Sequence, residues 1–129
     1  MTDTDGAGIV GVSTIGIPVS DQDRALAFYR DVLGLEVRVD APLPQIGGRW
    51  IMLAPPGAAV SVSLVPAKPD APAGVETGIR FEAVDAERAH ETLAGSGTEV
   101  GELLRWPGVP AMFAAHDPDG NRFEVVERA

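Results

Sequence analysis

Two stretches of the chain alternate apolar and polar residues and then continue into a helix-start signal. The first, residues 14–25, reads TIGIPVSDQDRA, and the second, residues 78–89, reads GIRFEAVDAERA. Aligned without a gap, Asp21 falls on Asp85, an offset of 85 − 21 = 64 residues. A repeat near half the length of a 129-residue chain predicts two copies of one supersecondary unit.

The first copy is predicted to fold as a strand, a helix and three further strands. Residues 13–19 alternate in the manner of a strand. Ser20 and Asp21 are helix-capping residues, and apolar positions at helical spacing continue to Gly34, a typical C-terminal glycine. The further strands are predicted at residues 35–39, 49–54 and 60–64.

The second copy repeats this order. A strand at residues 78–83 precedes a helix that is capped by Asp85 and ends in the GSG of residues 95–97. Between the last two strands the sequence HDPDGN, residues 116–121, is a strong turn signal. The three strands after the helix are predicted at residues 99–104, 111–115 and 122–126.

The composition is that of one soluble, globular domain, with 45% hydrophobic and 22% charged residues. No apolar run is long enough to cross a bilayer, no signal peptide opens the chain and there are no cysteines, so we expect a cytoplasmic protein. A net charge of −9 disfavours nucleic-acid binding and suits either solubility or a cationic ligand. The expected division is a flexible lead-in (1–8) before a single domain (9–129), with unit one at 9–65, a proline-rich linker at 66–75 and unit two at 76–128.

Three longer motifs carry a resemblance to a known family. They are IPVSDQDRALAFYRDVLGLEV (17–37), GIRFEAVDAERAHETL (78–93) and FAAHDPDGNRFEVVE (113–127). In these motifs the chain resembles the vicinal oxygen chelate superfamily of glyoxalase I, bleomycin-resistance proteins and extradiol dioxygenases. The resemblance implies an α+β fold, in which two βαβββ units form curled mixed sheets around a central cavity, often in a homodimer.

Metal-using members of that family hold a divalent ion with four side chains, one from each of four strands. The resemblance places these positions at Thr14, Ser63, Gly78 and Glu124, where the family expects His or Gln, Glu, His and Glu. One carboxylate, two hydroxyls and a glycine are a poor ligand set for a transition metal. The sequence therefore predicts no metal site and no cofactor, and it disfavours metal-dependent chemistry.

The alternation of the strands predicts which other side chains face the cavity. Arg80 shares a face with Gly78; it anchors an anionic or carbonyl group of a ligand, or it pairs with Glu82 or Glu124. Glu124 serves as a general base or as an inherited hydrogen-bond acceptor. The opposite faces are expected to pack beneath the helices, and they carry Ile15, Ile79, Phe81 and Phe123.

Two tryptophans and two histidines complete the candidates. Trp50 and Trp106 are placed to stack on a flat ligand, although tryptophan is also common in ordinary cores. His116 precedes the turn near the cavity rim, and His90 on the second helix is expected to face solvent.

Three functions fit these residues. The first is a metal-independent small-molecule binder of the bleomycin-resistance type, which confers antibiotic resistance by sequestering a planar or cationic drug or natural product. The second is a lyase, isomerase or dioxygenase-like enzyme with an unconventional or absent metal site, and the third is a regulatory domain with a vestigial cavity. We expect a homodimer that binds neither nucleic acid nor a membrane, and the sequence leaves open whether the units pair within or between chains.

Overall fold

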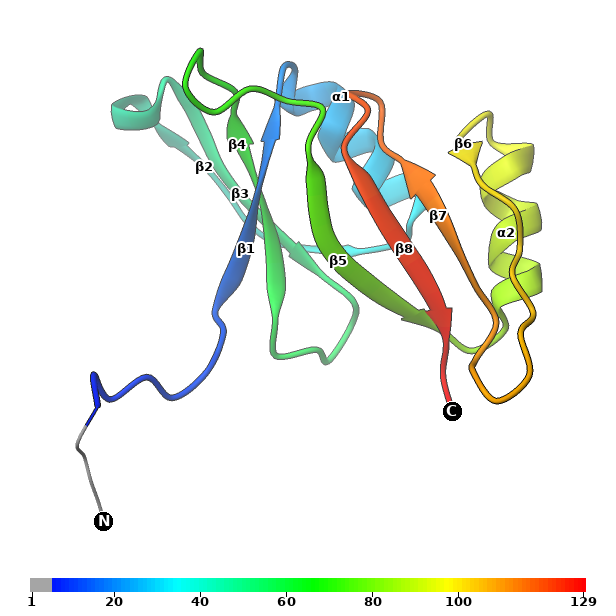
Figure 1. Cartoon of the computed structure of the whole chain (residues 1–129). Coiled ribbons are helices and arrows are strands. Elements are labelled where there is room, and N and C mark those ends of the chain that lie inside the picture. Colours follow the sequence, from blue (N-terminus) through cyan, green and yellow to red (C-terminus); the bar gives the residue numbers. More distant parts are fainter. Residues whose placement is uncertain (1–5) are drawn as a thin grey trace.

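Each predicted unit folds into a four-stranded mixed sheet with a helix against one face (Figure 1). The structure is a computed structural model that describes residues 6–129. Sheet one has the order β1-β4-β3-β2, with β1 and β4 parallel, and is built from β1 (Thr14–Val19), β2 (Glu36–Leu43), β3 (Gly48–Ala54) and β4 (Ser61–Pro66). Its helix α1 (Gln22–Ala27) continues into the π-helical turn η1 (Phe28–Val32), and a short 3-10 turn η2 (Pro44–Ile46) joins β2 to β3.

Sheet two has the equivalent order β5-β8-β7-β6, with β5 and β8 parallel. Its elements are β5 (Glu76–Ala83), α2 (Ala86–Gly95), β6 (Glu99–Val100), β7 (Met112–His116) and β8 (Arg122–Glu127). Both helices begin at the predicted caps, because the Asp21 carboxylate accepts the N–H of Arg24 and that of Asp85 accepts the N–H of Arg88. The α+β fold of two βαβββ units is therefore confirmed.

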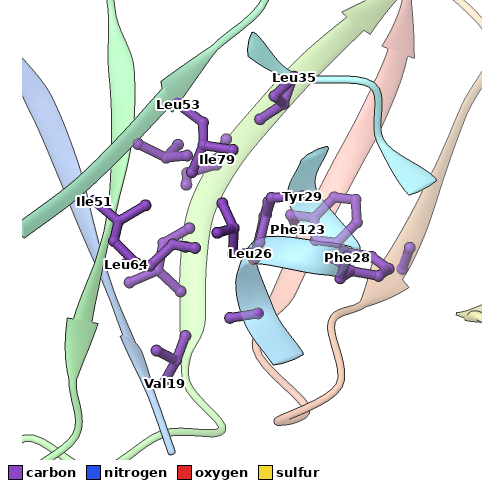
Figure 2. Close-up of a cluster of buried hydrophobic side chains, with 14 of the residues drawn as sticks. Val19, Leu26, Phe28, Tyr29, Leu35, Ile51, Leu53, Leu64, Ile79 and Phe123 are labelled. Carbon is purple, nitrogen blue, oxygen red and sulfur yellow. The ribbon is translucent and has the colours of Figure 1, made fainter. Parts of the chain in front are cut away.

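One core is shared by both sheets. Helix α1 lies between them (Figure 1), and Figure 2 shows Leu26, Phe28 and Tyr29 between side chains of sheet one and Phe123 of sheet two. The rings of Phe28 and Phe123 have centroids 6.2 Å apart. The four side chains predicted to pack beneath the helices join this core, with Ile79 and Phe123 buried and Ile15 and Phe81 packed against its edge. Because both covered faces turn toward α1, the two open faces point away from each other.

The turn between β7 and β8 joins unit two to unit one. Asn121 is fully buried, and its Oδ1 accepts the N–H groups of Gly74 and Val75 at 2.8 and 2.9 Å. Its Nδ2 donates to the carbonyl of Pro18 at the end of β1 and to the carboxylate of Asp117, each at 2.9 Å. One amide side chain therefore links the inter-unit loop, the first strand and its own turn.

Two aspartates of the same turn extend this junction to α1. The buried Asp117 accepts a 2.9 Å hydrogen bond from the hydroxyl of Tyr29. Asp119 accepts from the backbone N–H and the hydroxyl of Ser20, and it forms an ion pair with Arg24 at 3.1 Å. The predicted turn is thus also the contact that orients the two units.

Several predicted boundaries were wrong. The strand expected at residues 99–104 is only Glu99–Val100, because the chain leaves the sheet after the N–H of Gly101 has bonded Ala114 and returns for a single bridge between Leu104 and Met112. Strand β2 runs on to Leu43 rather than ending at residue 39. It includes Pro42, which an edge strand tolerates because one side of its backbone has no ladder partner.

The expected solvent-facing position of His90 holds only in part, because the residue is half-buried. Its Nε2 lies 2.8 Å from the carbonyl of Gly101, and its ring packs edge-on against Phe113 at 4.9 Å. The carbonyl left by the shortened β6 segment supplies this hydrogen-bond partner, which the sequence pattern could not show.

Part of the predicted lead-in, residues 1–5, lies outside the described residues. Residues 6–13 form no helix or strand and extend away from the sheets (Figure 1), with Ile9, Val10 and Val12 exposed. Within residues 6–129, no helix has the length and apolar character needed to span a membrane.

Replacing Asn121 with alanine tests the junction. We expect Asn121→Ala to lower the free energy of unfolding by about 3 kcal/mol, because it leaves two partly buried N–H groups, one carbonyl and the buried carboxylate of Asp117 without this partner. Urea denaturation followed by circular dichroism measures this change. Thr98→Ala is the control, since its hydroxyl bonds only Ser96 at the surface and should matter little. Equal midpoints for N121A and the wild type would contradict the assigned role.

Alkaline pH tests the buried hydrogen bond of Tyr29. Burial, together with the charge and hydrogen bond of Asp117, raises the pKa of Tyr29 far above its usual value of about 10. The folded chain therefore keeps a proton that the unfolded chain loses. Stability should be complete below about pH 10 and should fall by about 1.4 kcal/mol per pH unit above it.

Tyr29 is the only tyrosine, so tyrosinate absorbance at 295 nm reports on this one side chain. We expect the absorbance to appear only when the circular dichroism signal is lost. The Tyr29→Phe variant should lack the part of the alkaline loss of stability that comes from ionisation of this tyrosine. Tyrosinate formation near pH 10 in the folded protein would contradict the prediction.

Candidate functional site

Three predicted ligand-binding residues, Thr14, Trp50 and Ser63, lie on the open face of sheet one. The hydroxyl of Thr14 donates to the carbonyl of Ser61 at 3.2 Å. Ser63 pairs with Gly16 on one side and with Met52 on the other, and it is 1% exposed between its neighbours. Trp50 is half-buried on β3. Gly16, the strand neighbour of Ser63, carries no side chain over this face.

The open face of sheet two carries a chain of ion pairs. Glu124 receives Arg80 at 2.8 Å and Arg122 at 3.2 Å, and Arg122 also contacts Glu76 at 2.7 Å. Arg80 therefore adopts the ion pair with Glu124 that the sequence left as an alternative to ligand anchoring. Its side chain remains 70% exposed, so the guanidinium edge is still accessible from solvent.

A bulge in β5 explains how Glu76 reaches this network. Glu76 pairs with Arg122 and Arg80 pairs with Glu124, so the three residues between them oppose only Phe123. Gly78 lies in this bulge with a φ of +71°, a conformation that favours glycine. The predicted strand began at residue 78 and therefore left Glu76 out, although its acidic side chain two residues earlier was a usable signal.

The contacts within this network determine the protonation of the Glu76 carboxylate. The N–H of Gly78, followed by the Arg122 guanidinium, lowers the pKa of Glu76 below its usual range. In return, the hydrogen bond that Arg122 donates to Glu76 raises the pKa of Arg122. Glu76 and Arg122 therefore remain a charged pair throughout the neutral range.

His116 and Trp106 are placed differently. His116 pairs with Arg122 in the β7–β8 ladder; its Nδ1 is buried without a hydrogen-bond partner in the described chain and lies 3.9 Å from Glu99. Trp106 is 58% exposed in the loop between β6 and β7. The structure thus gathers Thr14, Trp50 and Ser63 on one sheet and Arg80, His116 and Glu124 on the other, with Trp106 in neither strand ladder.

The four positions predicted to correspond to the metal ligands of the family do not suit a divalent cation. Thr14 and Ser63 offer neutral hydroxyls on sheet one, and Gly78 offers no side chain. The carboxylate of Glu124 is already engaged by two guanidinium groups, whose charges disfavour a cation beside it. Over residues 6–129, no three His, Cys, Asp or Glu side chains are grouped to hold a metal ion.

The comparisons with known proteins agree on one family. Residues 11–125 match the model of the Glyoxalase/Bleomycin resistance protein/Dioxygenase superfamily. TnmS3, an antibiotic binding protein from Streptomyces sp. CB03234, is 29% identical, with a TM-score of 0.84 over 96% of this chain and 100% of that one.

Two further relatives are similar to this chain over a comparable length. A superfamily member from Sphaerobacter thermophilus DSM 20745 is 34% identical, with a TM-score of 0.82 over 93% of this chain and 98% of that chain. The uncharacterized protein YetH of Bacillus subtilis (strain 168) is 29% identical over 121 residues, which are 90% of this chain and 97% of YetH.

Removing Arg122 tests the charge network. We expect Arg122→Met to raise the pKa of Glu76 only part of the way to its usual value, because the N–H of Gly78 still donates to it. Carbon-13 NMR titration of the carboxyl group measures the change. The stabilisation from Glu76 is present above its unfolded pKa of about 4.3 and is lost as the pH falls through the lower folded value.

The control is Arg105→Met, which breaks a surface pair with Glu87 and should leave the titration of Glu76 unchanged. A Glu76 titration that is the same in R122M and the wild type would show that Arg122 does not act on this carboxylate.

Proposed function

The chain belongs to the glyoxalase/bleomycin resistance protein/dioxygenase superfamily, and we propose that it binds a small organic molecule without a metal ion. The observation that carries this proposal is the state of Glu124. This carboxylate is the only charged member of the four ligand positions, and it is held between Arg80 and Arg122. A surface built in this way offers hydrogen bonds and stacking to an organic ligand rather than coordination to a metal.

The similarity to an antibiotic-binding protein supports the same function. TnmS3 shares the fold over almost the whole chain at 29% identity. We propose that the present protein likewise sequesters a drug or natural product, in the manner of a resistance protein. The net charge of −9 favours a cationic ligand over an anionic one at the open faces.

The open face of sheet one is the proposed platform for a flat ligand. Gly16 beside Ser63 has no side chain, so a planar ring can approach the backbone closely there, and Trp50 on β3 supplies an aromatic surface for stacking. Arg80 and Glu124 of sheet two supply a donor and an acceptor for the polar groups of the ligand.

A homodimer is part of this proposal. Within one chain the two open faces point away from each other, so they do not enclose a cavity together. Sheet one of one protomer facing sheet two of its partner would bring Thr14, Ser63 and Trp50 to the partner's Arg80 and Glu124. Edge strands β1 and β5 lack a ladder partner on one side in the described chain, and such edges favour association.

Catalysis as a lyase, isomerase or dioxygenase-like enzyme is the alternative. It would require Glu124 to take part in proton transfer. The contacts of this carboxylate with Arg80 and Arg122 would have to be released first, so the ion pairs favour binding over turnover.

A glycine-to-leucine pair of variants tests the binding face. A Cβ on Gly16 would lie 4.0 Å from Oγ of Ser63, and a leucine side chain at this exposed position would cover the open face beside Ser63. With doxorubicin as a planar, cationic probe, we expect saturable quenching of tryptophan fluorescence in the wild type. Binding should be at least about tenfold weaker in Gly16→Leu, because the added side chain occupies the place of the ring.

Gly95→Leu is the matched control, since nothing lies within 4 Å of a Cβ at this position on α2. It should bind the probe like the wild type, and added EDTA should change neither protein. Sedimentation velocity of the same samples should show a dimer. Equal probe affinity in G16L and G95L, or binding abolished by EDTA, would overturn the proposal.

A further inference from the structure

A cavity of about 540 Å³ lies between the two units on the side of their helices. Its wall combines the corner at residues 32–35 after α1, the Pro55–Pro56 turn between β3 and β4, the end of β5 and one face of α2. The residues of the two open faces discussed above (Thr14, Trp50, Ser63, Glu76, Arg80, His116, Arg122 and Glu124) are absent from this wall. The volume is within the range of pockets that hold small organic molecules.

The deep part of this cavity is apolar. Leu35, Leu93 and Val125 are each at most 8% exposed, and they belong to the shared core. Val32, Leu33 and Phe81 continue the same surface toward the opening. An occupant must therefore have an apolar body, because these side chains offer no hydrogen bonds to a polar one.

Arg88 on α2 is the only cationic residue in the wall. It takes part in no ion pair among residues 6–129, whereas every other arginine except Arg38 pairs with a carboxylate. Arg38 instead donates to the carbonyl of Pro55. The guanidinium of Arg88 is thus left with unused donors beside an apolar cavity.

The two carboxylates in the wall are already engaged. Asp85 caps α2 by accepting the backbone N–H of Arg88, and Glu82 faces Arg128 at 3.9 Å. Thr92, one helical turn after Arg88, adds a hydroxyl on the same side of α2. Because these two carboxylates have partners of their own, Arg88 and Thr92 are the rim groups left to bind the acidic group of a ligand.

We infer that this cavity is a second binding site, which takes an organic anion with an apolar body, such as an aryl or branched alkyl carboxylate or sulfonate. The apolar body lies against Leu35, Leu93 and Val125, and the acidic group pairs with Arg88. The site uses different residues and the opposite ligand charge from the proposed open-face site. An experiment that contradicts this second site therefore leaves the proposed open-face function untouched, and the reverse also holds.

Titration with 1-anilinonaphthalene-8-sulfonate, an aryl sulfonate whose fluorescence rises in apolar surroundings, tests the inference on the full chain. We expect saturable binding of one probe per chain, with blue-shifted emission. Arg88→Ala should weaken binding by at least about tenfold, because a charge-assisted contact is lost. Lys68→Ala is the matched control: it removes the same charge from an inter-unit loop outside the cavity, where no ion pair is broken.

Thr92→Phe provides a second variant, because it fills the opening of the cavity from an exposed position and leaves the core intact. It should also weaken binding of the sulfonate by at least about tenfold, while doxorubicin binding stays at the wild-type level. Unchanged circular dichroism spectra confirm that each variant is folded. Equal weakening by R88A and K68A, unchanged sulfonate binding in T92F, or no saturable binding at all would overturn the inference.

Discussion

The buried amide of Asn121 is the contact on which the relative placement of the two units depends. It bonds the first strand of unit one, the loop between the units and its own turn. Asp117 and Asp119, which precede it in that turn, accept hydrogen bonds from Tyr29 and Ser20. These partners lie as far as 103 residues away in the chain. Because buried polar groups without partners are costly, this set of hydrogen bonds favours the observed arrangement of the units over others.

That arrangement determines where a ligand can bind. With the turn fixed against α1, the aromatic residues of η1 reach sheet two, and the covered faces of both sheets enclose one core. The open faces then diverge, which is why the proposed open-face site draws on a second protomer. The same packing leaves a cavity between the helical sides of the units, where Arg88 is the only cation.

Local sequence patterns predicted much of the fold and which residues lie on each face of a strand. The alternation around Ile79 and Phe123 identified buried positions, and Asp21 and Asp85 marked both helix starts, because these features depend on near neighbours in the chain. The end of β6 at Val100, the inward position of His90 and the role of Glu76 depend on partners from other elements. No local sequence pattern encodes these three features.

The sequence by itself determined the duplicated βαβββ order, the caps, the two faces of each strand and the absence of a full set of metal-binding side chains. Only the tertiary structure decided that Arg80 pairs with Glu124, that the turn at residues 116–121 holds the units together and that their open faces diverge. The physical reason is the range of the interactions. Periodicity and capping act over a few residues, whereas ion pairs across strands and buried hydrogen bonds between units need the folded chain to bring distant residues together.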